Sequence, residues 1–463
     1  MAKTKSKVSV EACDLMVRNA CVLTMDKRRR KYTNGAIAIQ GRDIVAVGPD
    51  ARIAKRYRPR RVIDAGGALV HPGVIDMHTH ITHHMVGKLI AEEAVDTDDA
   101  GPWVAQQYTG LINAIDSDEM EYANALLCGL DMLTAGVTMV TDPGCAFATS
   151  AVAEALEGLG MRGSLADPWI IDRHGPQLTD IKRVTVSRRG ALSRLGRELH
   201  RNKDPDALVR GHISVYGMGD NSDEVILAAK ACADEAGVMF NMHQSQSVDD
   251  AVFDDDRFGK HPLVHFRDIG LLDDNCVFVH MNVLRPDEIK PVVDSGMTIV
   301  WSPTNTWYYG TRMQCPNSLP KLAKRGVNLT IGTDVSKGAA FGDQLYTAYV
   351  LARDQGDYLS PEQILAMMTI NAAKALRLED RLGSIEAGKR ADIVIRNDST
   401  PEAWPRINME RQQLLLARSR SVDTVIVDGR VVIRGGRHTM LDEQVVYRLA
   451  QETAELMVAR ARG

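Results

Sequence analysis

The chain has 463 residues, of which 44% are hydrophobic, enough for a large domain with its own core and a smaller second one. Its 56 basic and 60 acidic residues give a formal net charge of −4, so there is no broad positive field and a nucleic-acid partner is not expected. Seven cysteines occur without any CxxC pair, which is typical of free thiols in a reducing compartment: Cys13, Cys21, Cys128, Cys145, Cys232, Cys276 and Cys315.

The N-terminal segment is basic but has no apolar targeting core, and no run of about 18 apolar residues occurs. We therefore expect a cytoplasmic protein with no membrane partner. Two basic clusters, 27–31 (KRRRK) and 55–61 (KRYRPRR), allow a targeting or anion-binding interpretation. The short apolar runs beside them favour solvated turns between strands instead.

The two ends of the chain share a strand-rich pattern. Near the N-terminus, short apolar runs at 15–24, 36–40 and 43–47 are separated by turn residues, which indicates antiparallel strands. Near the C-terminus, Asp428-Gly429 marks a hairpin between the runs 424–427 and 430–434. This pattern predicts one small β-sandwich domain assembled from residues 1–70 and 382–463, the second part also carrying a terminal helix.

The middle of the chain, residues 71–381, alternates helical and strand-like segments. A helix is expected over 222–237, with Ser222 as its N-cap and Gly237 as its stop, and an apolar strand follows at 238–243. The same alternation continues through 275–280, 286–294, 297–302, 321–325 and 327–334. Repeated units of this kind predict an α/β fold, a (β/α)8 TIM-like barrel whose active site lies at the carboxyl ends of its strands.

Polar residues that bind metals stand where these strands end. His78 and His80 follow an apolar run one residue apart, so a strand places both imidazoles on one face. His243, His280 and Asp334 end three later strands. Histidines and a carboxylate suit a divalent ion, and a catalytic site leaves one coordination position for water.

At this point the chain resembles the amidohydrolase superfamily, in the branch related to cytosine deaminases and triazine hydrolases. The resemblance covers nearly the whole chain and rests on the motifs at 72–80 (PGVIDMHTH), 279–281 (VHM), 302–305 (SPTN), 332–334 (GTD), 369–376 (TINAAKAL) and 383–392 (GSIEAGKRAD). A narrower similarity is to bacterial hydrolases of phenylurea and thiocarbamate herbicides, including molinate hydrolase.

The resemblance implies a metal held by His78, His80, His243 and Asp334, with His280 as a further ligand or as a hydrogen-bond donor to the substrate. The segment 211–217 (GHISVYG) lacks the lysine or acid that bridges two metals in binuclear relatives. One divalent ion per chain is therefore expected, zinc first, with cobalt, iron and manganese left open. Oligomers are usual in such families, so a homo-oligomer is expected too.

The catalytic roles follow from these groups. A divalent ion lowers the pKa of its water from about 15.7 towards ~7, so hydroxide is available at neutral pH. We assign Asp334 to accept the water's proton and pass it to the leaving group, and His280 to stabilise the developing oxyanion.

One position departs from the family pattern. Deaminases and chlorohydrolases of the family carry His-x-x-Glu, whose glutamate protonates a ring nitrogen, but residues 243–246 read HQSQ. The Gln246 amide cannot shuttle a proton. We therefore predict cleavage of a C–N or C–S bond at the carbonyl of a small neutral urea, carbamate, thiocarbamate or amide, including herbicide-type substrates. The alternatives are a deaminase or chlorohydrolase of an N-heterocycle and, from another class, an inactive barrel used as a scaffold.

Residues in the loops that follow the strands are candidates to bind the small-molecule substrate. Aromatic residues gather after residue 300, where they form either a substrate wall or packing beneath a loop. His83 and His84 follow the first motif and are either support for the metal ligands or exposed loop histidines. The full set of substrate-binding candidates is Gln246, His83, His84, Arg173, His174, Trp301, Asn305 and Trp307.

Overall fold

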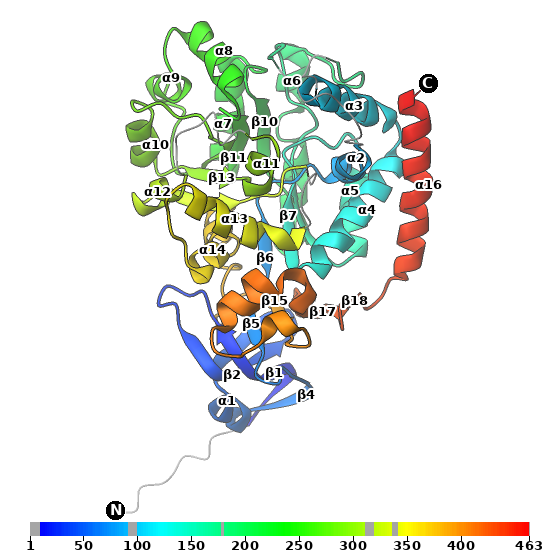
Figure 1. The fold of residues 1–463 in the computed structure, drawn as a ribbon, viewed down its shortest axis with the longest axis vertical. Coiled ribbons are helices and arrows are strands. Elements are labelled where there is room, and N and C mark those ends of the chain that lie inside the picture. Colours follow the sequence, from blue (N-terminus) through cyan, green and yellow to red (C-terminus); the bar gives the residue numbers. More distant parts are fainter. Residues whose placement is uncertain (1–9, 91–99, 177–179, 311–318, 336–340, 463) are drawn as a thin grey trace, which may run out of the picture.

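A computed structural model describes residues 10–90, 100–176, 180–310, 319–335 and 341–462. Parallel strands with helices around them make up most of the molecule, and a mixed sheet lies at one end (Figure 1). No helix in these ranges is both long and apolar enough to cross a membrane. Cys315 lies outside them, and the six described cysteines are free thiols.

The mixed sheet has nine strands and draws on both ends of the chain. It contains β1 (Glu11–Leu23), β2 (Lys31–Gln40), β3 (Asp43–Pro49), β4 (Tyr57–Asp64), β5 (Leu69–Pro72), β15 (Ile393–Arg396), β16 (Val422–Val427), β17 (Arg430–Arg434) and β18 (Arg437–His438). The two ends meet where β5 pairs antiparallel with β15. Strands from both ends thus share one sheet, while a separate β-sandwich domain over 1–70 and 382–463 stays a prediction.

The turns of this sheet agree only partly with the sequence interpretation. Asp428-Gly429 joins the antiparallel strands β16 and β17, as predicted. The basic cluster 27–31 lies in the turn between β1 and β2, again as predicted, with its last residue, Lys31, beginning β2. The expectation of a turn at 55–61 is wrong, because these residues end helix α1 (Asp50–Arg56) and begin β4, which pairs parallel with β1. An edge strand tolerates basic side chains and proline, so their presence did not require a turn.

The central strands form two parallel sheets. One contains β6 (Val74–Asp76), β7 (Val137–Thr141), β8 (Arg162–Leu165) and β9 (Val209–Gly211). The other contains β10 (Ile213–Gly217), β11 (Phe240–Gln244), β12 (Cys276–His280), β13 (Thr298–Trp301) and β14 (Asn328–Ile331).

The two parallel sheets are linked at both edges. Only His212 separates β9 from β10. At the other edge, Met77 N donates to Ile331 O at 3.1 Å and Asp334 N donates to His78 O at 2.7 Å. The predicted alternation of parallel strands and helices is confirmed, and a single closed eight-stranded barrel stays a prediction that these links support.

Helices alternate with the parallel strands and cover them. They are α2 (His84–Leu89), α3 (Ala100–Ala114), α4 (Asp118–Thr134), α5 (Thr149–Gly158), α6 (Arg188–Arg194), α7 (Asp223–Ala236), α8 (Val248–Phe258), α9 (Pro262–Asp268), α10 (Ile289–Ser295), α11 (Pro303–Tyr308), α12 (Leu319–Lys324), α13 (Gln344–Asp354), α14 (Pro361–Met367), α15 (Ile370–Ala375) and α16 (Glu443–Arg462). Shorter helical turns occupy Ile81–His83, Arg197–Lys203, Phe341–Asp343, Pro401–Ala403, Glu410–Leu416 and Arg418–Ser421.

Local sequence signals explain where α7 begins and ends. The Ser222 side chain accepts a hydrogen bond from Val225 N, and Gly237 ends the helix in the left-handed conformation at φ 65°. The predicted terminal helix is present as α16 (Figure 1). Its buried Ala450 and Met457 pack with Ile112 of α3 and Ala123 of α4, so the chain end covers the outside of the helical layer.

Candidate metal centre

Five predicted ligands meet at the carboxyl ends of the parallel strands. His78 and His80 follow β6, His243 lies in β11, His280 ends β12, and Asp334 follows β14. Their side chains are almost completely buried. Because parallel strands that share an edge bring their ends together, residues separated by up to 256 positions converge here; residues 78 and 334 set that span.

The distances suit a single ion. Asp334 Oδ1 lies 3.3 Å from His80 Nε2 and 3.9 Å from His78 Nε2. Asp334 Oδ2 lies 3.8 Å from His280 Nε2, and the Nε2 atoms of His80 and His243 are 3.4 Å apart. Two overlapping groups result, His78 with His80 and His243, and His78 with His280 and Asp334, each with ligand atoms within 4.8 Å of one another.

The protonation of the histidines also fits a metal. His78 Nε2 is buried and has no hydrogen-bond partner among the described residues. Burial lowers the pKa of His78 well below its usual value and that of His243 to about 4, so both imidazoles are neutral at pH 7. Neutral imidazole is the form that binds metal ions. The residues therefore form a site for one divalent cation.

Neighbouring groups hold the ligands in place. The His243 Nδ1 donates to the backbone carbonyl of Tyr216 at 2.8 Å, which leaves Nε2 facing the site. Asp76 is buried and accepts hydrogen bonds from His78 N at 3.0 Å and from Thr333 Oγ1 at 2.9 Å. One carboxylate thus ties the first histidine motif to the strand end that carries Asp334.

The backbone is strained at two of the ligands. His280 has φ 75° and Asp334 has φ 61°, in the left-handed region that non-glycine residues rarely adopt. Such conformations persist where the surroundings determine them, and they gather at functional sites. The strained backbone at these two strand ends directs the side chains of His280 and Asp334 toward the metal site.

The two histidines after the first motif face different ways. His83 is buried, stacks on His80 with 5.4 Å between ring centroids, and its Nδ1 lies 3.1 Å from the Tyr108 hydroxyl. His84 turns away, because its Nε2 lies 3.3 Å from Asp131 of α4 and its ring stacks on Phe341. Neither is an exposed loop histidine, and only His83 adjoins a ligand. Their roles in substrate binding stay predictions.

Three further candidates lie on connections between elements. Gln246 stands between β11 and α8, where its backbone carbonyl accepts from Asn282 Nδ2 at 3.0 Å. Arg173 is partly buried and its backbone N donates to Asp220 O, while His174 is exposed. Substrate contact by any of the three stays a prediction.

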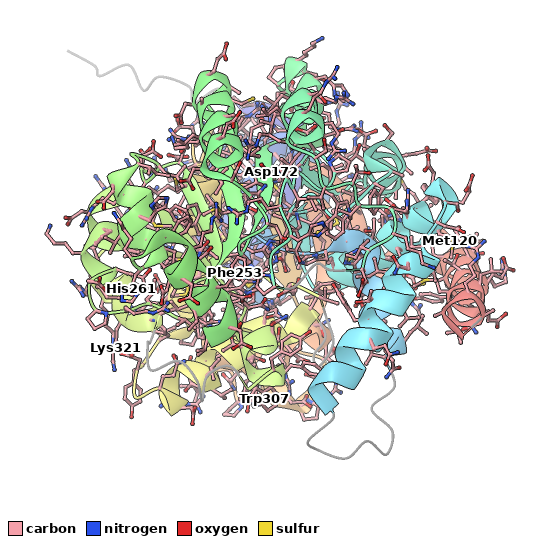
Figure 2. All side chains as sticks on the ribbon, turned by 90° about the horizontal axis from the view of Figure 1, so that it is seen from above. Met120, Asp172, Phe253, His261, Trp307 and Lys321 are labelled. Carbon is pink, nitrogen blue, oxygen red and sulfur yellow. The ribbon has the colours of Figure 1, made fainter. Side chains whose placement is uncertain are left out.

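The aromatic candidates after residue 300 do not form one wall. Trp301 is 1% exposed and belongs to the main hydrophobic core, which favours the packing interpretation. Trp307 is 67% exposed, and Figure 2 shows it at the periphery of the molecule. Asn305 is buried in α11 between them. The clustering in sequence therefore did not predict a shared surface.

The sequence interpretation missed three residues around the centre. Asp76 stands within the first motif, but nothing in the pattern showed that it contacts Thr333. Tyr216 and Trp169 stack on each other beside His243. Tyr216 lies near the carboxyl end of β10 and Trp169 follows β8, which was the available signal, although single aromatic residues at strand ends are too common to select them.

Comparison with known proteins gives the class of this chain. Residues 69–432 match the model of the amidohydrolase family, so the chain belongs to that family. It is a metal-dependent hydrolase that acts on carbon–nitrogen bonds. It is 28% identical over 459 residues to a 5-methylthioadenosine/S-adenosylhomocysteine deaminase of Desulforudis audaxviator, covering 96% of this chain and 99% of the relative. It is 25% identical to a 5'-deoxyadenosine deaminase of Methanosarcina mazei, covering 97% and 100%.

Solved structures share the fold. A zinc-bound adenosine deaminase of Xanthomonas campestris superposes with a TM-score of 0.86 at 24% identity, covering 97% of this chain and 100% of that one. The zinc complex of atrazine chlorohydrolase from Arthrobacter aurescens superposes with a TM-score of 0.78 at 22% identity, covering 96% and 100%. The broader resemblance seen in the sequence is confirmed, and the narrower one to phenylurea and thiocarbamate hydrolases finds no support in these relatives.

Proposed function

We propose that this chain is an aminohydrolase that converts the amino group of an N-heterocycle into an oxo group, with adenine nucleosides such as 5'-deoxyadenosine as its substrate class. The observation that carries the proposal is the similarity to two deaminases over nearly the whole length of both chains. The buried site for one divalent cation agrees with such a reaction, and we propose zinc as the ion. This function was the alternative interpretation of the sequence.

The reaction adds water to the carbon that bears the amino group and releases ammonia, so a hydroxyl replaces the amine and atoms balance. A bound divalent ion supplies a water of lowered pKa. Asp334 lies within 4 Å of His78, His80 and His280, and we assign its carboxylate to take the proton from water and deliver it to the departing amine. His280, on the other side of that carboxylate, donates a hydrogen bond to the new oxygen.

A second candidate function rests on Gln246. A ring carbon becomes electrophilic when a neighbouring ring nitrogen is protonated, and an amide side chain cannot supply that proton. A urea, carbamate, thiocarbamate or amide carbonyl needs no such step, so Gln246 favours hydrolysis of that class, herbicides included. If the aminohydrolase proposal holds, a group other than Gln246 protonates the ring.

A substrate panel separates the two candidates. Purified enzyme loaded with zinc is assayed with 5'-deoxyadenosine, 5-methylthioadenosine and cytosine for ammonia release, and with a phenylurea, a carbamate and a thiocarbamate for amine or thiol release. Turnover of the nucleosides alone supports the aminohydrolase. Turnover confined to the carbonyl compounds contradicts it and supports the second candidate.

The variant Gln246→Glu probes the same question at one residue. If no other residue supplies the ring proton, restoring the family's acid should raise kcat/KM for the heterocycle by about 10²-fold, the lower value typical of a placed proton donor. The variant Gln106→Glu, at an exposed position of α3, is the matched control and should leave kcat/KM unchanged. An unchanged rate in Gln246→Glu would mean that another residue already supplies the proton.

A cytoplasmic homo-oligomer also remains part of the proposal. Size-exclusion chromatography with light scattering tests the oligomeric state.

A further inference from the structure

Two metal-binding histidines belong to a closed circuit of five rings. The ring centroids of Tyr216 and His243 are 4.7 Å apart. Trp169 stacks on Tyr216 with 5.5 Å between ring centroids and 15° between ring planes. Trp169 lies 6.2 Å from His83, which stacks on His80 at 5.4 Å. His80 and His243 close the circuit at 5.4 Å. The indole of Trp169 therefore lies across the circuit from His80 and His243. The Tyr216 ring lies between Trp169 and His243, and the His83 ring lies between Trp169 and His80.

This circuit borders accessible space. Phe147 stacks on Trp169 at 5.6 Å, and Tyr108 packs edge-on against His83 at 5.9 Å. Phe147, Tyr108 and Tyr216 are each partly exposed, whereas Trp169 is 3% exposed. The rings thus run from the solvent side of the molecule to the metal ligands. Apolar faces of this kind favour flat aromatic groups, because ring pairs stack at such separations.

Trp169 is held in a strained conformation. Its φ is 45°, which is unusual for a bulky residue. Its backbone N donates to Gly144 O at 2.8 Å, and its carbonyl accepts from Arg194 Nη2 at 2.9 Å. Bonds on both sides of the residue fix the strained backbone. Strain that the surroundings impose in this way is characteristic of binding sites.

No described residue accepts a hydrogen bond from the indole N–H of Trp169. Its Nε1 is buried and makes no hydrogen bond to the part of the chain that the structure describes. A buried donor without a partner costs free energy, so native proteins rarely keep one unless a ligand or a water satisfies it. An indole nitrogen only donates, which fixes the partner as an acceptor atom.

We propose that Trp169 and its neighbouring rings form the subsite for a planar N-heterocycle and that the Trp169 N–H donates to a ring nitrogen other than the one protonated during the reaction. The inference rests on the proposed aminohydrolase function and names the residue that selects the substrate class. A heterocycle offers both a flat face for Tyr216 and Phe147 and an acceptor for the indole. An aliphatic thiocarbamate offers no flat face.

The variant Trp169→Phe tests this assignment because it keeps a ring and removes the donor. The probes are 5'-deoxyadenosine and its 3-deaza and 7-deaza analogues, each of which lacks one ring acceptor. The wild type should prefer 5'-deoxyadenosine over one analogue by roughly tenfold in kcat/KM, about the value of one hydrogen bond, or in inhibition constant if that analogue is not turned over. Trp169→Phe should lose this preference through KM, with kcat changed less.

The control is Trp404→Phe, which makes the same change at a 55% exposed tryptophan whose Nε1 donates to Asp398 O. It should keep the wild-type preference. Full discrimination in Trp169→Phe would overturn the assignment and leave Trp169 as packing. If the wild type turns over no nucleoside, quenching of tryptophan fluorescence by 5'-deoxyadenosine decides. Saturable quenching that Trp169→Phe abolishes would overturn the proposed reaction and keep the subsite, whereas no quenching overturns both.

Discussion

The imidazole of His243 donates through Nδ1 to the backbone carbonyl of Tyr216 at 2.8 Å. This bond selects the tautomer that leaves Nε2 available to a metal ion. It also couples the metal site to the aromatic circuit, since the residue that supplies the carbonyl supplies one of the rings. Orientation of the ligand and geometry of the aromatic circuit therefore depend on the same stretch of β10.

Replacing His243 by glutamine should remove the metal. Loss of a group that only hydrogen-bonds a metal ligand lowers the affinity for the metal by about 10–100-fold. Loss of the ligand itself should lower that affinity by more than this range. Elemental analysis after dialysis against a zinc buffer measures the effect. His200 makes the same Nδ1 bond at 2.8 Å, to Arg197 O, but is exposed. His200→Gln should keep one zinc, and equal loss in both variants would contradict the assigned ligand.

Replacing Asp334 by asparagine should abolish turnover more than binding. The amide keeps an oxygen but cannot accept a proton, so kcat should fall by about 10²–10⁴-fold while KM changes little. Steady-state kinetics with metal content measured on the same samples provides the test. Asp116→Asn is the control, because that carboxylate is exposed and pairs with Arg460 on the surface. A variant that holds zinc and keeps its kcat would show that Asp334 moves no proton.

The metal ligands could be predicted because their positions follow from regular structure. Each stands where an apolar run stops, and parallel strands bring such ends together whatever the chain does between them. His78, His80, His243, His280 and Asp334 required only that rule. The family resemblance assigned four of them to the metal and left His280 as a further ligand or a hydrogen-bond donor.

The surroundings of the ligands could not be predicted in the same way. Trp169 meets Tyr216 of β10 only because the connection after β8 folds over the strand ends, and no period in the sequence encodes that approach. Trp301 and Trp307 show that closeness in sequence does not give a shared environment. They are six residues apart in sequence, yet one is 1% exposed and the other 67%. Substrate-facing positions depend on loop paths, which local patterns do not determine.

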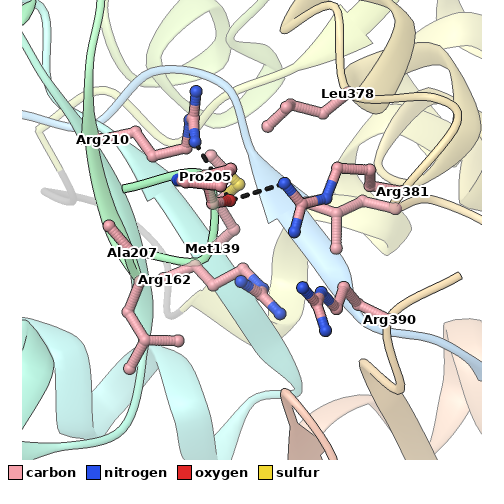
Figure 3. Close-up of a pocket in the computed structure, with 10 residues that line it drawn as sticks. Met139, Arg162, Pro205, Ala207, Arg210, Leu378, Arg381 and Arg390 are labelled. Carbon is pink, nitrogen blue, oxygen red and sulfur yellow. Dashed lines mark hydrogen bonds between the residues drawn. The ribbon is translucent and has the colours of Figure 1, made fainter. Parts of the chain in front are cut away.

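Arg162 should be essential for stability where a neighbouring arginine is not. A small cavity of about 20 Å³ at the amino ends of the strands is lined by Arg162, Arg210, Arg381 and Arg390 (Figure 3). Arg162 is buried and pairs with Asp392 and Asp428, each at 2.7 Å, which joins β8 to the mixed sheet. Removing one partner of a buried ion pair costs about 3–5 kcal/mol, because the other charges stay buried.

Urea unfolding of Arg162→Met should therefore show a loss of about 3–5 kcal/mol. The matched control is Arg210→Met in the same cavity. Arg210 donates to Pro205 O but makes no ion pair within 4 Å to any described residue. Its replacement should cost under about 1 kcal/mol, as for a single neutral hydrogen bond. Similar losses in both variants would mean that the cavity walls matter through packing and not through the ion pairs.

Glu121 of α4 should make stability depend on pH. Its side chain is 1% exposed, contacts Arg183 at 2.9 Å and accepts from Ala148 N at 2.7 Å. Burial outweighs these contacts and raises the pKa of Glu121 from 4.5 to about 7. The folded chain then holds a proton that the unfolded chain has released, so the stability conferred by that proton is complete below pH 4.5 and is lost as pH rises to about 7.

The size of this effect follows from the shift, since each pKa unit corresponds to about 1.4 kcal/mol and the total is about 3 kcal/mol. Glu121→Gln does not titrate. The unfolding free energy of the wild type minus that of Glu121→Gln should therefore fall by about 3 kcal/mol between pH 4.5 and 7 and stay level above pH 7. The exposed Glu154→Gln on α5 should show no such slope. A difference that instead rises with pH would mean that the Arg183 ion pair outweighs burial and keeps Glu121 ionised in the folded chain.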